Sequence, residues 1–188
     1  FMAGGDFVHP TLGGVLGHYL VRWDGTTLRT VEPFPNPLGS EGTSGPVHAL
    51  RAQSVGLFNR NLYIGGDFTL AGTVPAARVA RWNGSAWSSL GTGAANGVGG
   101  GPVQAIAVTA GVVYVAGDFN AAGGNPANRI ARWNGSAWST LGSGASNGVG
   151  AGVRALAVDG GDLYAGGFFT TAGGNAANWV ARWNGSAW

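Results

Sequence analysis

Cysteine and lysine are both absent from this sequence of 188 residues. Without cysteine, the chain can form no disulfide, no cysteine-ligated zinc site and no cysteine nucleophile. Charged residues make up 10% of the chain, where about a quarter is usual. Arginine supplies all ten basic side chains, and the formal net charge is only +2. A charge this small and dispersed does not indicate nucleic-acid binding.

Long apolar runs are missing as well. None approaches the roughly 20 residues that a helix needs to cross a bilayer, so we expect no membrane span. Glycine, by contrast, is abundant at 37 positions, a level close to that of disordered chains. Hydrophobic residues still make up 45%, with eight tryptophans, which indicates a folded domain with a real core.

A tandem repeat organises the whole chain. The motif Arg-Trp-Asn-Gly-Ser-Ala-Trp occurs three times and is preceded by one diverged copy. The copies lie at Arg22–Leu28, Arg81–Trp87, Arg132–Trp138 and Arg182–Trp188. A Gly-Gly-Asp-Phe segment, or a close variant, keeps the same rhythm and begins at Gly4, Gly65, Ala116 and Gly166. The chain therefore consists of about 3.8 units of about 50 residues.

Each unit is predicted to form four short antiparallel strands. In the last unit, Val153–Val158 alternates apolar and small or polar residues, as strands do. A turn at Asp159–Gly161 leads to a second strand, Asp162–Phe169, and a loop rich in glycine, alanine and asparagine follows at Thr170–Asn178. The third and fourth strands then flank an Asn-Gly pair, which is the strongest local signal for a hairpin.

The expected hairpin turn has consequences for the tryptophans. A two-residue loop at Asn83-Gly84 would pair Trp82 with Ser85 and Ala80 with Trp87, so that the two indoles lie diagonally on one face. A small sheet with large aromatics on one face is not stable alone and must lay that face on a neighbour. Units of this kind, stacked on one another, make a β-propeller.

We therefore assign the tryptophans a structural role in packing between blades; a row of sugar-stacking platforms is the alternative. The tryptophans concerned are Trp23, Trp82, Trp87, Trp133, Trp138, Trp183 and Trp188.

The Gly65-Gly66 pair that ends a second strand, followed by Trp82 and Trp87, resembles the kelch-type propeller repeat. The spacing of these tryptophans is closer than in the kelch pattern, and the units look still more like the glycine-rich repeats of large bacterial surface and secreted proteins. This resemblance implies a propeller used for binding or assembly. It implies no particular reaction, because such folds host both enzymes and scaffolds.

The unit boundaries leave the two ends incomplete. We expect one propeller segment over residues 1–188, with an incomplete first blade and a clipped last one. The four blades are predicted at residues 1–31, 46–91, 102–142 and 152–188. Either the chain is an excerpt of a longer propeller or another chain fills its open edges, and exposed strand edges favour pairing with neighbours. Self-association through open blade edges, or binding of another protein, is therefore expected.

Recurring charges have a structural explanation. Aspartate recurs at the end of the second strand and arginine in the third, so we expect these residues to form salt bridges or to cap the glycine-rich loop. They are Asp6, Asp67, Asp118, Arg22, Arg81, Arg132 and Arg182. A calcium site built from one aspartate per blade is the weaker alternative.

Catalytic signatures are not found. The sequence has no recurring close pair of carboxylates and no phosphate-binding P-loop. The three histidines, His9, His18 and His48, occur once each, and a metal site would need more convergent ligands. We expect no cofactor, no metal and no enzymatic activity.

Binding is expected where the units differ most, because variable loops on a rigid scaffold usually carry function. The first blade has a longer loop at Val8–Tyr19 and a proline-rich exit loop at Arg29–Pro46. The candidate binding residues there are His9, His18, Glu32, Phe34 and Glu41.

The sequence thus predicts a non-enzymatic, extracellular or cell-surface propeller that acts as a binding or assembly module. Two alternatives stay open: a glycan-binding, lectin-like propeller, and a fragment of a larger propeller enzyme whose catalytic residues lie outside this chain. The Asn-Gly-Ser triplets at Asn83, Asn134 and Asn184 also match the N-glycosylation acceptor, although the turn already explains them.

Overall fold

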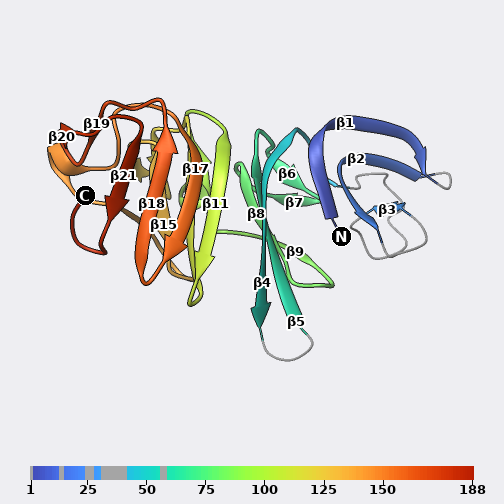
Figure 1. The fold of residues 1–188 in the computed structure, drawn as a ribbon. Coiled ribbons are helices and arrows are strands. Elements are labelled where there is room, and N and C mark those ends of the chain that lie inside the picture. Colours follow the sequence, from blue (N-terminus) through green and yellow to red (C-terminus); the bar gives the residue numbers. More distant parts are fainter. Residues whose placement is uncertain (1, 13–14, 24–27, 31–41, 56–58) are drawn as a thin grey trace.

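The computed structural model describes residues 2–12, 15–23, 28–30, 42–55 and 59–188. Its architecture is all-β, with several antiparallel sheets. Four larger sheets follow one another along the chain and stand side by side (Figure 1). In the part that the structure describes, these sheets do not close into a ring.

We number the larger sheets 1 to 4 in chain order. Sheet 1 contains β1 (Met2–Leu12), β2 (Val15–Trp23) and β3 (Leu28–Thr30). Sheet 2 contains β4 (Val47–Val55), β5 (Asn59–Gly66), β8 (Val79–Trp82) and β9 (Trp87–Ser89). Sheet 3 contains β11 (Val103–Thr109), β12 (Val112–Gly117), β15 (Ile130–Trp133) and β16 (Trp138–Thr140). Sheet 4 contains β17 (Val153–Asp159), β18 (Asp162–Gly167) and β21 (Val180–Trp183).

Short elements fill the connections that were expected to be loops. Between the second and third strands of each later unit lies a small hairpin, formed by β6 (Leu70–Ala71) and β7 (Val74–Pro75), by β13 (Ala121–Ala122) and β14 (Asn125–Pro126), or by β19 (Thr171–Ala172) and β20 (Asn175–Ala176). The glycine-rich connectors contain one-turn 3₁₀ helices, η1 (Gly93–Ala95) and η2 (Gly144–Ser146). After η1, strand β10 (Val98–Gly99) pairs with β13, so this connector is tied to the unit that follows it.

The hairpin turn differs from the sequence prediction. Trp82 pairs directly with Trp87, and Arg81 pairs with Ser88, so the loop holds four residues rather than two. The reason is the Asn83 side chain, whose Oδ1 accepts hydrogen bonds from the backbone N–H groups of Ser85 at 2.9 Å and of Ala86 at 2.8 Å. This local bonding favours a wider turn than the expected two-residue one. The prediction of a two-residue turn was wrong, but the two indoles do share a face.

The glycine that ends the second strand is required by a close backbone approach. The first strand carries a bulge in sheets 2, 3 and 4, and the second strand passes tightly beside it. A Cβ atom on Gly117 would overlap the carbonyl oxygen of Pro102, and Gly66 and Gly167 stand in the same position in their sheets. Glycine at this point therefore lets the bulge form.

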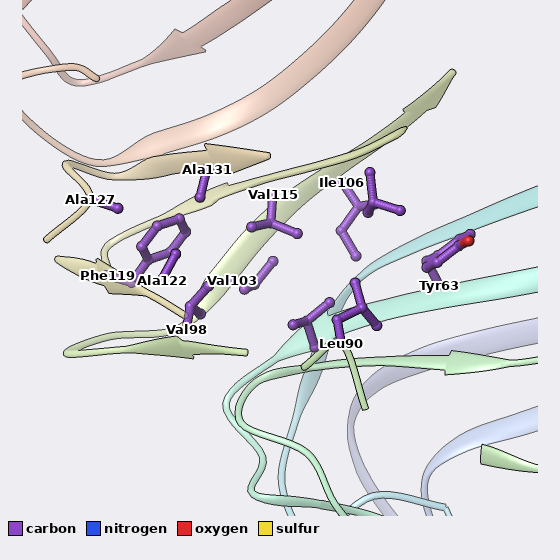
Figure 2. Packing of buried hydrophobic residues seen from close by; sticks show 12 residues of the cluster. Tyr63, Leu90, Val98, Val103, Ile106, Val115, Phe119, Ala122, Ala127 and Ala131 are labelled. Carbon is purple, nitrogen blue, oxygen red and sulfur yellow. The ribbon is translucent and has the colours of Figure 1, made fainter. Parts of the chain in front are cut away.

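Two faces can be distinguished in each of sheets 2, 3 and 4. The indole face carries the tryptophan pair, and the tyrosine face, on the opposite side, carries Tyr63, Tyr114 or Tyr164. One buried cluster joins Tyr63 of sheet 2, and Leu90 directly after β9, to the indole face of sheet 3. Figure 2 shows Ile106 of sheet 3 between Val115 of the same sheet and Tyr63 of sheet 2, all within this cluster. A second cluster joins the tyrosine face of sheet 3 to sheet 4 in the same way.

Candidate functional site

The tryptophan pairs of sheets 3 and 4 lie at the contact with the preceding sheet, and the pair of sheet 2 is buried. The ring centroids are 5.2 Å apart for Trp82 and Trp87, and the corresponding pairs in sheets 3 and 4 are 5.4 and 5.6 Å apart. Such tilted aromatic pairs stabilise one another in addition to the area they bury. Trp23 lies in β2 opposite Leu28, at the register position of the first indole of each pair.

The second indole of a pair also bonds the preceding unit. Trp138 Nε1 donates to the carbonyl oxygen of Leu90 at 2.8 Å, and Trp188 Nε1 donates to that of Leu141 at 3.0 Å. Trp87 is the equivalent residue in sheet 2, and its buried Nε1 has no acceptor among the described residues. These bonds join consecutive units through a polar contact as well as an apolar one.

Among the residues whose side chains the structure describes, the recurring aspartates and arginines do not pair with one another. Asp67 pairs with Arg78 at 3.3 Å, whereas Asp118 pairs with Arg154 of the next unit at 2.8 Å. Arg182 pairs with Asp162 at 3.3 Å. All three ion pairs are partly exposed, so each contributes about 0–1 kcal/mol.

Arg81 and Arg132, which were also expected to face the aspartates, instead donate through Nε to Ser88 at 3.2 Å and to Ser139 at 3.3 Å. Asp6 lies in β1 and Arg22 in β2, where Arg22 is opposite Met2.

The predicted binding residues of the first unit are placed only in part. His9 and His18, which were expected in a loop, lie in strands β1 and β2, because these strands form one long hairpin in this unit. Glu32, Phe34 and Glu41 lie outside the described residues. The binding surface built on these five residues stays a prediction. His48 is an exposed residue of β4.

Neither a metal-binding cluster nor a membrane-spanning helix is found in the described ranges. Within the described ranges, no three histidine or acidic side chains gather in a way that could hold a metal ion. No helix in the same ranges is long and apolar enough to cross a membrane.

The tyrosine face of sheet 4 differs from its equivalents in sheets 2 and 3. Val180 is 65% exposed, whereas Val79 and Ile130, at the same register position, are fully buried. Tyr164 is exposed as well, while Tyr63 and Tyr114 are buried. The sequence also changes here, because aromatic residues replace polar or charged ones beside this face. Phe168 stands where the other units have Asp67 or Asp118, and Trp179 stands where they have Arg78 or Arg129.

These two aromatic residues are 69% and 64% exposed, respectively. We call Tyr164, Phe168, Trp179 and Val180 the terminal apolar patch. Exposed apolar patches on folded proteins often mark interaction sites. The sequence carried a signal for this patch, the change from Asp-Phe to Phe-Phe in the last Gly-Gly segment, but its exposure could not be derived without the sheet stacking.

A polar cleft lies between sheets 2 and 3. Its volume is about 370 Å³, and its lining includes the polar and aromatic residues Gln53, Asn61, Tyr63, Arg81, Ser88 and Trp133. A wider groove of about 610 Å³ adjoins it and shares Ser88 and Trp133. Sequence reasoning missed this cleft. The signal was present in the unit alignment, where Gln53 and Asn61 occupy the positions of Thr109 and Val112 in the next unit.

Two comparisons with known proteins find no match. No family model matches the chain, and no curated protein is similar to it.

Proposed function

We propose that this chain is a segment of a kelch-like β-propeller that acts as a non-enzymatic binding or assembly module outside the cell or on its surface. The observation that carries the proposal is the terminal apolar patch, where aromatic side chains replace charged ones on an uncovered sheet face. An aromatic surface of this kind favours association with another apolar surface.

The order of the sheets supports the propeller part of the proposal. Four sheets built from units of about 50 residues stand side by side in chain order (Figure 1). Sheets 2, 3 and 4 repeat one stacking rule, in which the indole face of a sheet packs on the tyrosine face of the sheet before it. Repetition of a single contact between neighbouring units is typical of propellers and solenoids.

The location and the non-enzymatic role rest on the sequence. The chain is free of lysine, rich in glycine, alanine and serine, and similar in its motifs to glycine-rich repeats of surface and secreted proteins. Its eight acidic residues form no recurring close pair of the kind that acid–base catalysis needs.

The partner that we propose for the terminal apolar patch is a second copy of this chain. In sheets 2 and 3 the same face is covered by another sheet of this repeat, so the fold itself contains the type of surface that fits it. A second copy supplies the same exposed patch, and association of the two patches would bury Val180 as Val79 and Ile130 are buried.

The test is sedimentation velocity over a range of protein concentrations. We expect the wild-type chain to associate as concentration rises. The double variant Phe168→Asp, Trp179→Arg introduces the residues that unit 3 carries at these positions, and we expect it to sediment as a monomer with an unchanged unfolding temperature. The control variant is Leu70→Ser, which removes an exposed apolar side chain from β6, away from the patch.

A wild-type chain that is monomeric at every concentration would contradict the proposal, and so would association that the double variant leaves unchanged. Loss of association in the Leu70→Ser control to the same degree would point to nonspecific stickiness and would equally overturn it.

A further inference from the structure

The cleft between sheets 2 and 3 has the chemistry of a ligand site that is separate from the terminal apolar patch. Sheet 2 contributes Gln53, Asn61, Tyr63 and Arg81, and sheet 3 contributes the Trp133 indole. Its volume of about 370 Å³ is at the lower end of the range for small-ligand pockets. A mono- or disaccharide-sized molecule would fit a space of this size.

Arg81 is the charged group of the cleft. The equivalent arginine of the last unit shows that an arginine at this position can bind a carboxylate. In sheet 4 the equivalent Arg182 pairs with the carboxylate of Asp162, Nη1 to Oδ2, at 3.3 Å. The residue equivalent to Asp162 in sheet 2 is Asn61, which carries no charge. Among the described residues, Arg81 pairs with no acidic side chain, and its Nε donates only to Ser88.

The surrounding polar groups are neutral and can both donate and accept hydrogen bonds. Gln53 and Asn61 are direct partners across β4 and β5, so their amides lie side by side on one face. The Tyr63 hydroxyl donates to Gln53 Oε1 at 3.5 Å, the outer limit of a hydrogen bond, which leaves it available for a closer acceptor. Ser88 adds a second hydroxyl beside Arg81.

An aromatic side chain forms part of the cleft wall beside these polar groups. Trp133 is half-buried and lines both the cleft and the wider groove beside it. Amides and hydroxyls suit the hydroxyl groups of a sugar, an indole suits the apolar face of its ring, and a guanidinium suits a carboxylate through paired charge-assisted hydrogen bonds.

From this combination we infer that the cleft binds a carboxylate-bearing sugar, a uronic acid or a chain of such sugars, with the carboxylate on Arg81. The ligand carboxylate takes the place that Asp162 holds beside Arg182 in the last unit. The adjoining groove of about 610 Å³ gives a longer saccharide room to continue past Trp133.

The test measures binding of D-glucuronate and of neutral D-glucose to the whole chain by isothermal titration calorimetry. We expect glucuronate to bind with a dissociation constant of about 1 mM or below, and glucose to bind at least about tenfold more weakly. Asn61→Asp installs the residue that neutralises the arginine in sheet 4, and we expect it to weaken glucuronate binding by about tenfold or more.

Two further variants are matched to the repeat. Gln53→Thr introduces the residue that unit 3 has at this position, so it should fold normally and weaken the binding of both sugars together. Arg132→Gln alters the equivalent arginine of sheet 3, which has Val112 in place of Asn61, and we expect it to leave binding unchanged. Thermal unfolding of each variant shows whether the fold is kept.

Three results would overturn the inference: no glucuronate binding up to about 10 mM, equal binding of glucuronate and glucose, or an Asn61→Asp variant that folds and binds like the wild type. Because none of these variants lies in the terminal apolar patch, the outcome is independent of the self-association experiment.

Discussion

Sheets 3 and 4 share a register but differ in what covers them. Their strands pair at equivalent positions, both carry a tryptophan pair, and both bond the preceding unit through the second indole. Yet Ile130 is buried under sheet 4, while its equivalent Val180 is exposed. The same local structure therefore forms with or without a neighbour on the tyrosine face, and that neighbour decides how much each side chain contributes to stability.

The largest expected effect comes from truncating these equivalent residues. Ile130→Ala removes buried methyl groups between two sheets, and we expect it to lower the free energy of unfolding by about 2–5 kcal/mol. Val180→Ala removes methyl groups that already face water, and we expect a change within about 0.5 kcal/mol. Urea denaturation of both variants, with protein concentrations kept low enough to prevent association, measures the difference.

Equal losses in the two variants would mean that the tyrosine face of sheet 4 is covered in solution. Val79→Ala, at the same position in sheet 2, should behave like Ile130→Ala and serves as the internal control.

A smaller effect distinguishes the indole bonds of sheets 3 and 2. Trp138→Phe removes the donor to the Leu90 carbonyl oxygen and leaves that acceptor without its partner, which costs about 1–3 kcal/mol beyond the change in packing. Trp87→Phe removes a buried N–H that has no acceptor among the described residues. Within these residues the substitution leaves no acceptor unpaired, and it removes the cost of burying an unpaired donor. Chemical denaturation should therefore show the Trp138 variant to be less stable than the Trp87 variant; the reverse order would contradict the assigned bond.

The sequence could predict the parts of the fold that depend on the repeat. The alternation in Val153–Val158, the glycine pairs and the spacing of the tryptophans gave all-β units with antiparallel strands, because these patterns reflect local geometry. The turn at Asn83 was missed because the asparagine side chain bonds two backbone N–H groups, a preference that the Asn-Gly pair alone does not reveal.

Contacts between units were harder to predict. The pairing of Asp118 with Arg154 of the next unit, rather than with a recurring arginine, depends on how two sheets stack. The polar cleft needs Gln53 and Asn61 from one unit and Trp133 from another, so it could not be found within any single unit. The geometry between sheets decides such contacts, and no spacing along the chain determines it.

The smallest expected effect separates two exposed ion pairs that differ in what they connect. Asp118 joins sheet 3 to sheet 4 through Arg154, whereas Asp162 and Arg182 lie within sheet 4. We expect Asp118→Asn and Asp162→Asn each to cost less than about 1 kcal/mol, because water and salt screen both pairs. Unfolding measured at about 0.05 M and about 1 M salt should show each loss shrinking as screening increases. The loss of unfolding free energy in Asp118→Asn could stay the same at high salt while the loss in Asp162→Asn disappears. In that case the contact between sheets 3 and 4 shields the Asp118–Arg154 pair from salt more than the exposure of the two side chains indicates.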